Sequence, residues 1–203
     1  MMFDGQLRTA INPAIDRFAA RLVQAGATAN GTTMAGFALG LCAAAFIASG
    51  WLLFGLTFIF LSRLCDGLDG AIAKQTRSTD FGGYLDIVLD FAFYGLIPLA
   101  FAVYNPAQNA VAASVLLLSF YVNGASFLAF AIIAEKRKLT TEARGKKSFF
   151  FTTGLAEAGE TLAVFTMFCL VPNWFAPIAY IFAAICFWTA FARILQAKAA
   201  FQN

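Results

Sequence analysis

The sequence predicts an all-α integral membrane protein, in which a bundle of six transmembrane helices follows an amphipathic interfacial helix. The first observation is composition: 61% of the 203 residues are hydrophobic and only 12% are charged, whereas a soluble domain carries about 25% charged residues. The second is a series of apolar runs, several of which reach the roughly 20 residues that a helix needs to cross the hydrocarbon. Residues 1–203 therefore read as a single membrane domain without a soluble one.

The N-terminal region predicts an amphipathic helix over residues 12–25. Asn12 suits a helix N-cap, and Pro13 suits the first helical turn. One face then carries an apolar stripe of Ile15, Phe18 and Leu22. We expect this helix to lie in the membrane interface, although a short helix packed on the bundle fits the pattern as well. Gly26 is expected to end it.

Six transmembrane spans are expected at about 32–50, 51–74, 82–104, 108–134, 150–171 and 174–195. The second run has only 12 residues before Arg63, fewer than a full crossing needs. Its helix should therefore continue into the cytoplasmic interface. Arg63 itself is expected to extend its charged end to that interface.

The positive charges predict the orientation of these spans. All 14 Lys and Arg residues fall on one side of the predicted topology, whereas the opposite links, near residues 49–50, 105–108 and 172–173, carry no charge. The positive-inside rule then places both termini in the cytoplasm, and we expect the protein in the cytoplasmic (inner) membrane. Trp51 and Trp174 would mark the outer interface.

Four carboxylates within 25 residues organise the chain. Asp66 and Asp69 are three residues apart, and Asp86 and Asp90 are four apart, so each pair shares a helix face. Antiparallel helices joined by a short loop would bring both pairs together at the cytoplasmic surface. Ionised groups at a membrane are costly and usually functional, and Mg²⁺ prefers such oxygen ligands together with phosphate oxygens. Solvated carboxylates that cap two helices are the alternative, but capping does not explain the paired spacings.

With Gly70, Ala73, Lys74 and Gly82, these carboxylates resemble the signature of the CDP-alcohol phosphotransferases, D-x2-D-G-x2-A-R-x8-G-x3-D-x3-D. The chain differs at two points, because Lys74 replaces the Arg and seven residues rather than eight separate Lys74 from Gly82. The resemblance implies a membrane enzyme of phospholipid biosynthesis, commonly a homodimer. Such an enzyme transfers a phosphatidyl group from a CDP-linked lipid, such as CDP-diacylglycerol, to a small alcohol and releases CMP.

The resemblance also implies the roles of the carboxylates, at an active site that faces the cytoplasm. Asp66, Asp69 and Asp86 would bind two divalent cations, Mg²⁺ or Mn²⁺. Asp90 would bind metal and also act as the general base. Two such cations can hold a diphosphate, neutralise its charge and stabilise an in-line displacement.

Four residues that follow the first carboxylate pair are candidates for binding the nucleotide or its phosphates. Gly70 and Ala73 continue the helix face of Asp66, and their small size lets a phosphate approach the backbone. Lys74 and Arg77 could contact phosphate, although lysine lacks the bidentate fork of arginine. Both cations also simply satisfy the positive-inside rule.

Asn30 is a further candidate for the nucleotide site. Residues 27–32 resemble the T-P-N-x-x-T entry of the family, with Ala29 in place of the proline. A role for Asn30 as a helix cap explains the same residue equally well.

The start of the fifth span carries four candidates for the acceptor side of the site. Arg144 and Lys147 could hold a phosphate of the acceptor or the lipid, whereas an anchor for anionic lipids is the alternative for this basic cluster. Glu157 and Glu160 are three residues apart inside the span, where acids need a cation, water or a polar ligand. A structural pairing with Arg63 or Arg144 is the alternative for these two acids.

The acceptor alcohol is left open between serine, glycerol phosphate, inositol phosphate and others. Residues 94–98, Tyr-Gly-Leu-Ile-Pro, are similar to the S-F-G-x-x-P run of phosphatidylserine synthases. The basic residues near the fifth span instead favour a phosphorylated acceptor.

Composition excludes several other classes of function. The chain has no histidine, and its four cysteines lack the spacing of a metal site. A net charge of +3 does not suggest a nucleic-acid partner. Two alternatives to the enzyme are kept: a divalent-cation transporter that uses the carboxylates as an ion path, and a catalytically inactive membrane scaffold.

Overall fold

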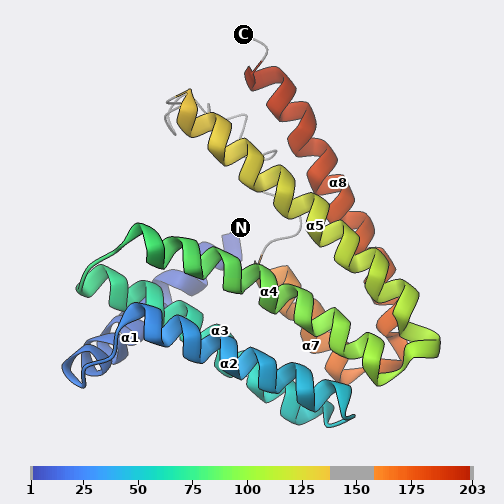
Figure 1. The fold of residues 1–203 in the computed structure, drawn as a ribbon, viewed down its shortest axis with the longest axis horizontal. Helices are drawn as coiled ribbons and strands as arrows, with labels where there is room; N and C mark the ends of the chain where they lie inside the picture. The colour runs from blue at the N-terminus through green and yellow to red at the C-terminus, as the bar shows by residue number, and fades with distance from the viewer. Residues whose placement is uncertain (1, 138–157, 202–203) are drawn as a thin grey trace. The chain divides into compact units, whose positions relative to one another are not determined.

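The computed structural model describes residues 2–137 and 158–201 of the chain, which form helices joined by short turns (Figure 1). No strand occurs within these ranges. The helices are α1 (Met2–Gln24), α2 (Ala29–Ala48), α3 (Leu52–Gln75), α4 (Asp80–Tyr104), α5 (Pro106–Lys136), α7 (Ala158–Leu170), the short 3₁₀ helix η2 (Pro172–Trp174) and α8 (Phe175–Phe201). The all-α prediction is confirmed.

Within the described residues, four segments are long and apolar enough to cross a membrane: α2, α4, α5 and the joined η2–α8 segment, Pro172–Phe201. They match four of the six predicted spans. Helix α3 has the length of a span, but it carries the charges of Arg63, Asp66 and Asp69. The membrane-spanning roles of α3 and of the fifth predicted span stay predictions.

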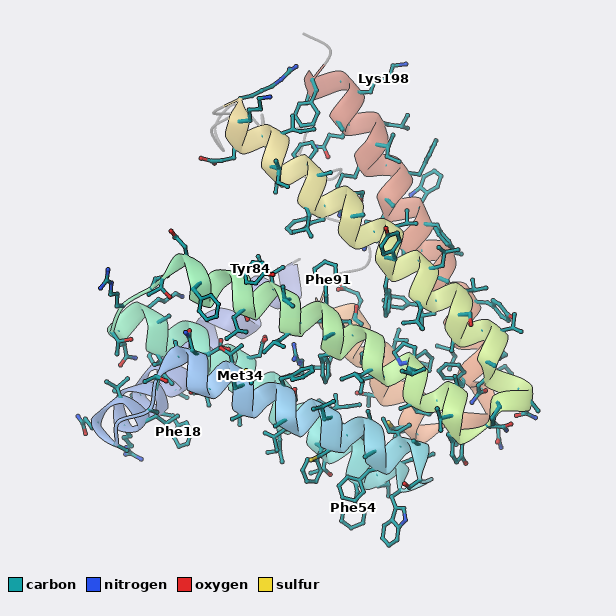
Figure 2. The ribbon with its side chains drawn as sticks, viewed as in Figure 1. Phe18, Met34, Phe54, Tyr84, Phe91 and Lys198 are labelled. Atoms are coloured by element: carbon teal, nitrogen blue, oxygen red, sulfur yellow. The ribbon has the colours of Figure 1, made fainter. Side chains whose placement is uncertain are left out.

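Large apolar side chains lie on the outer faces of these helices, as a lipid surrounding requires. Met34, Phe54 and Phe91 are 51%, 53% and 43% exposed (Figure 2). Water would penalise such exposure, whereas lipid tails are as apolar as these side chains.

The chain divides into two compact units, residues 1–100 and residues 101–203, and each is described by itself. In the first unit, α2 packs along α3, and α1 packs on α3 near its C-terminal end (Figure 1). In the second unit, α5 packs along α8 (Figure 1).

Helix α1 is attached to α3 by an apolar contact and a hydrogen bond. Ala19 is fully buried with Leu68 and Ile72 of α3, and Gln75 Nε2 donates to the backbone carbonyl of Asp16 at 2.9 Å. The helix therefore packs on the bundle, and its location in the membrane interface stays a prediction. Gly26, with a φ of 87°, follows the helix as expected.

The predicted start of α1 at Asn12 is wrong, because the helix begins at Met2 and includes Pro13 in its interior. A proline removes one backbone hydrogen bond and kinks a helix, but it need not end the helix.

The contact between α2 and α3 depends on glycines, which let the helix backbones approach closely. A Cβ placed on Gly36 of α2 would lie 3.0 Å from the Cβ of Cys65. A Cβ placed on Gly55 of α3 would lie 2.5 Å from Ile47 Cγ1 and 3.3 Å from the carbonyl of Ala43. The two helices are therefore in near backbone contact.

This packing predicts opposite effects for the same substitution at two positions of α3. We expect Gly55→Ala to destabilise the protein by about 1–3 kcal/mol, because the added methyl overlaps the buried Ile47. Gly67→Ala should be neutral or stabilising by up to about 1 kcal/mol, through helix propensity, since its nearest new neighbour would be Ile15 Cδ1 at 3.9 Å. Thermal unfolding in detergent measures both, and shifts of the same sign would contradict this packing.

The second unit has an aromatic core where α4 ends and α8 begins. The rings of Phe101 and Phe175 stack at 4.9 Å, and Phe168 of α7 lies 4.4 Å from Phe175. Asn109 of α5 donates from Nδ2 to the carbonyl of Phe101 at 3.0 Å, which fixes the turn between α4 and α5.

Arg193 joins α8 to α5 in the same unit. Its Nη1 donates to the carbonyl and the Oδ1 of Asn123, at 3.0 and 2.9 Å, and to Ser126 Oγ at 2.6 Å. A partly buried guanidinium is thereby satisfied by oxygens of the neighbouring helix.

Candidate functional site

The four predicted carboxylates are positioned by α3 and α4 of the first unit. Asp66 and Asp69 lie in the C-terminal half of α3. The chain then turns, and Thr79 Oγ1 accepts a hydrogen bond from the backbone N–H of Gly82 at 3.1 Å, which caps the start of α4. Asp86 and Asp90 follow in the first turns of α4.

The side chains of α2, α3 and α4 surround a pocket with about 220 Å³ of empty volume. All four predicted carboxylates line it, together with Thr33, Gly36, Phe37, Ser62, Arg63 and Leu89. Its lining is rich in carboxylate oxygens, which are the ligands that hard divalent cations prefer.

Three of the carboxylates are close enough to share one cation. Asp66, Asp86 and Asp90 each offer an oxygen, and these oxygens lie within 4.8 Å of one another. Two of them come from α4 and one from α3, so the group exists only when the helices pack. Oxygen ligands of this kind suit Mg²⁺ or Mn²⁺.

Asp69 supplies a separate observation that favours a cation. Its side chain is buried, with 6% of the residue exposed, and its Oδ2 has no hydrogen-bond partner among the described residues. A buried carboxylate oxygen without a partner is costly. The residues therefore fit a divalent cation, which would satisfy this oxygen.

Arg63 points into the same pocket. Its Nη1 lies 2.6 Å from Asp90 Oδ1 and 3.4 Å from Asp66 Oδ1, and 15% of its side chain is exposed. Two carboxylates therefore bind the guanidinium beside the pocket, and the extension of Arg63 to the membrane interface stays a prediction. The alternative pairing of the acids of the fifth span with Arg63 or Arg144 stays a prediction.

The predicted nucleotide-binding residues lie outside the lining of this pocket. Asn30 does not cap α2, because Thr28 Oγ1 accepts from Gly31 N at 3.1 Å. Instead, Asn30 Oδ1 lies 2.9 Å from where a Cβ of Gly82 would stand, so glycine at position 82 makes room for this carboxamide.

The remaining candidates are Gly70, Ala73 and Lys74 of α3 and Arg77 of the turn that follows it. A Cβ on Gly70 would have no heavy atom within 4 Å, which leaves space for a ligand beside the helix. Ala73 is half-buried, whereas Lys74 and Arg77 are exposed.

Three of the four acceptor-side candidates, Arg144, Lys147 and Glu157, lie outside the described residues. Glu160 is exposed in the first turn of α7.

Sequence reasoning missed three polar residues of the pocket, namely Thr33, Ser62 and Arg63. A signal for two of them was present. Ser62 and Arg63 precede Asp66 by four and three residues, so they share its helix face.

Taken together, the helices and the pocket define a helical membrane protein with an oxygen-lined site suited to divalent cations. The chain belongs to the CDP-alcohol phosphatidyltransferase family, whose family model matches residues 27–195.

Known proteins similar to this chain agree with that assignment. The inner membrane protein YnjF of Escherichia coli strain K12 is 45% identical over 193 residues, which cover 95% of this chain and 94% of YnjF. The archaetidylinositol phosphate synthase of Methanothermobacter thermautotrophicus is 39% identical over 93 residues, 45% of this chain and 46% of the synthase.

A crystal structure of the phosphatidylinositol phosphate synthase PgsA1 of Mycobacterium tuberculosis, with CDP-DAG bound, has a similar fold. The TM-score is 0.72 at 20% sequence identity, and the match covers 91% of this chain and 93% of PgsA1. At this identity the similarity supports the fold alone.

Proposed function

We propose that this protein is a metal-dependent transferase that moves a phosphatidyl group from a CDP-linked lipid to an alcohol in phospholipid biosynthesis. The family and the relatives support phosphatidyl transfer from a CDP-lipid. The acid-lined pocket is the observation that supports metal dependence. Three of its carboxylates converge, and the Oδ2 of the fourth, Asp69, has no hydrogen-bond partner among the described residues.

In this proposal, Asp66, Asp69, Asp86 and Asp90 would hold two divalent cations, Mg²⁺ or Mn²⁺. When bound, the cations would neutralise the diphosphate of the CDP-lipid and stabilise charge on its oxygens. The carboxylates come from two helices, α3 and α4, and the fold brings them to one pocket.

Asp90 is proposed as the general base of the transfer. It accepts the proton of the acceptor hydroxyl while the hydroxyl oxygen forms a bond to the phosphorus that carries the lipid. The bond between this phosphorus and the bridging oxygen breaks, and CMP leaves with that oxygen. The contact from Arg63 to Asp90 Oδ1 fixes the position of the carboxylate beside the pocket.

The other candidates are proposed to bind the two substrates. Gly70, Ala73, Lys74, Arg77 and Asn30 would contact the nucleotide and its phosphates. The open space beside Gly70 and the exposed cations at the end of α3 support this role. Arg144, Lys147, Glu157 and Glu160 are kept as acceptor-side candidates.

The proposed location is the cytoplasmic membrane, with both termini and the active site facing the cytoplasm. The relative YnjF is named as an inner membrane protein, and the uncharged outer links support the orientation. The homodimer stays a prediction.

The proposed function is tested by measuring CMP release from CDP-diacylglycerol by the purified protein. Serine, glycerol phosphate and inositol phosphate are offered separately, each with Mg²⁺, with Mn²⁺ or with EDTA. We expect CMP with one acceptor class, and its loss in EDTA, because the diphosphate cannot be neutralised without the cations. Absence of CMP, together with Mn²⁺ flux into liposomes without nucleotide, would contradict the transferase and favour a transporter.

A further inference from the structure

Arg63 lies between α3 and α4, the two helices that carry the carboxylates of the acid-lined pocket. A single guanidinium nitrogen, Nη1, contacts Asp90 Oδ1 of α4 at 2.6 Å and Asp66 Oδ1 of α3 at 3.4 Å. These two residues belong to the group of three whose oxygens lie within 4.8 Å of one another. The positive charge therefore sits among the oxygens that a divalent cation would use.

The surroundings of Arg63 hold it in this position. The guanidinium carbon Cζ lies 3.8 Å from the centre of the Phe93 ring, and Phe93 is 1% exposed. Gly40 of α2 makes room for that ring, because a Cβ there would lie 2.7 Å from Phe93 Cδ2. Nη2 contacts Ser62 Oγ at 3.4 Å. A stacked, largely buried arginine with these contacts has little freedom to leave.

We propose that Arg63 is a resident counter-cation of the site, which stabilises the carboxylates before metal binds and competes with divalent cations for Asp66 and Asp90. This inference rests on the proposed function only in requiring that the carboxylates bind divalent cations. Without a divalent cation, the three converging carboxylates repel one another, and the positive charge of Arg63 offsets part of that repulsion. When a divalent cation enters the pocket, the positive charge of Arg63 repels it.

The two roles give opposite signs for one substitution. Removing the charge of Arg63 lowers the stability of the metal-free protein, because the carboxylates lose their partner. The same change strengthens divalent binding, because the repulsion between Arg63 and the metal is gone. A purely structural arginine would lower stability with and without metal, and it would leave the metal affinity unchanged or weaker.

The test uses the full-length protein in detergent and the variants Arg63→Gln and Arg63→Lys. Mn²⁺ alone is the probe, and its dissociation constant is measured by electron paramagnetic resonance or calorimetry. We expect Arg63→Gln to bind Mn²⁺ about tenfold more tightly than the original protein, or more, and Arg63→Lys to stay within about threefold, because it keeps the charge. Thermal unfolding in EDTA should show a lower midpoint for Arg63→Gln, and saturating Mn²⁺ should raise that midpoint more than it raises that of the original protein.

Arg17→Gln is the matched control, since Arg17 is an exposed arginine of α1 in the same unit. It should leave both the Mn²⁺ affinity and the unfolding midpoint unchanged. Equal or weaker Mn²⁺ binding by Arg63→Gln would overturn the role of Arg63 while leaving the proposed function intact. Failure of the original protein to bind Mn²⁺ would overturn both. If Arg63→Gln does not fold in EDTA but folds with Mn²⁺, that outcome supports the proposal.

Discussion

Asp90→Asn should reduce CMP release by about 10²–10⁴-fold, because an amide keeps the shape of the carboxylate but cannot accept the proton of the acceptor hydroxyl. The measurement is CMP release from CDP-diacylglycerol by purified protein, at a saturating concentration of divalent cation. The acceptor is the alcohol that supports CMP release in the assay of serine, glycerol phosphate and inositol phosphate. Unchanged lipid synthesis by the variant would show that the assignment of the base is wrong.

A matched control separates chemistry from folding. Asp80→Asn removes an exposed carboxylate from the first turn of the same helix, α4, and should leave CMP release within about twofold, since surface substitutions are usually worth less than about 0.5 kcal/mol. The Asp90→Asn variant should remain folded, because Arg63 keeps its contact with Asp66 at 3.4 Å. Thermal unfolding of both variants checks this point.

Asp66→Asn should weaken Mn²⁺ binding by about 100-fold or more and remove most of the CMP release. Asp66 is the α3 member of the converging group, and substitution of even an outer-shell partner of a metal typically costs about 10–100-fold in affinity or activity. Calorimetry with Mn²⁺ and the CMP assay measure the two effects separately.

The same variant distinguishes the enzyme from a scaffold. If cells whose only copy carries Asp66→Asn keep the function of the protein, the inactive-scaffold alternative is favoured. The expected loss of Mn²⁺ affinity is also opposite in sign to the gain predicted for Arg63→Gln, although the two side chains form one ion pair. A purely structural ion pair would not produce opposite changes from its two partners.

Much of the fold was accessible from local patterns. Gly26 and the uncharged turn at Asn105 predict helix ends. The structure has a φ of 87° at Gly26, and Asn105 Oδ1 accepts a capping hydrogen bond from the backbone N–H of Gln108. These features depend on residues close in sequence, so periodicity and turn chemistry are sufficient to find them. The start of α1 was not predictable in this way, since Pro13 reads as a first-turn residue but lies inside the helix.

The pairing of the four carboxylates was predictable for a similar reason. Spacings of three and four place each pair on one helix face, and the short link between the two helices allows little choice other than an antiparallel return. The glycine contacts were not predictable, because the partner of each glycine comes from another helix. Gly40 meets Phe93 and Gly82 meets Asn30, and nothing local in the sequence identifies these partners.

By itself, the sequence determined an all-helical membrane protein with its acids in two pairs, because helical periodicity and hydrophobic length are properties of neighbouring residues. Only the tertiary structure shows that the guanidinium of Arg63 pairs with Asp66 and Asp90. A long charged side chain in an apolar helix can extend along the helix or pair with carboxylates, and its pairing here depends on the free energy of ion pairs with carboxylates of two helices. These ion pairs form only after α3 and α4 have packed, so they cannot be inferred from any pattern along the chain.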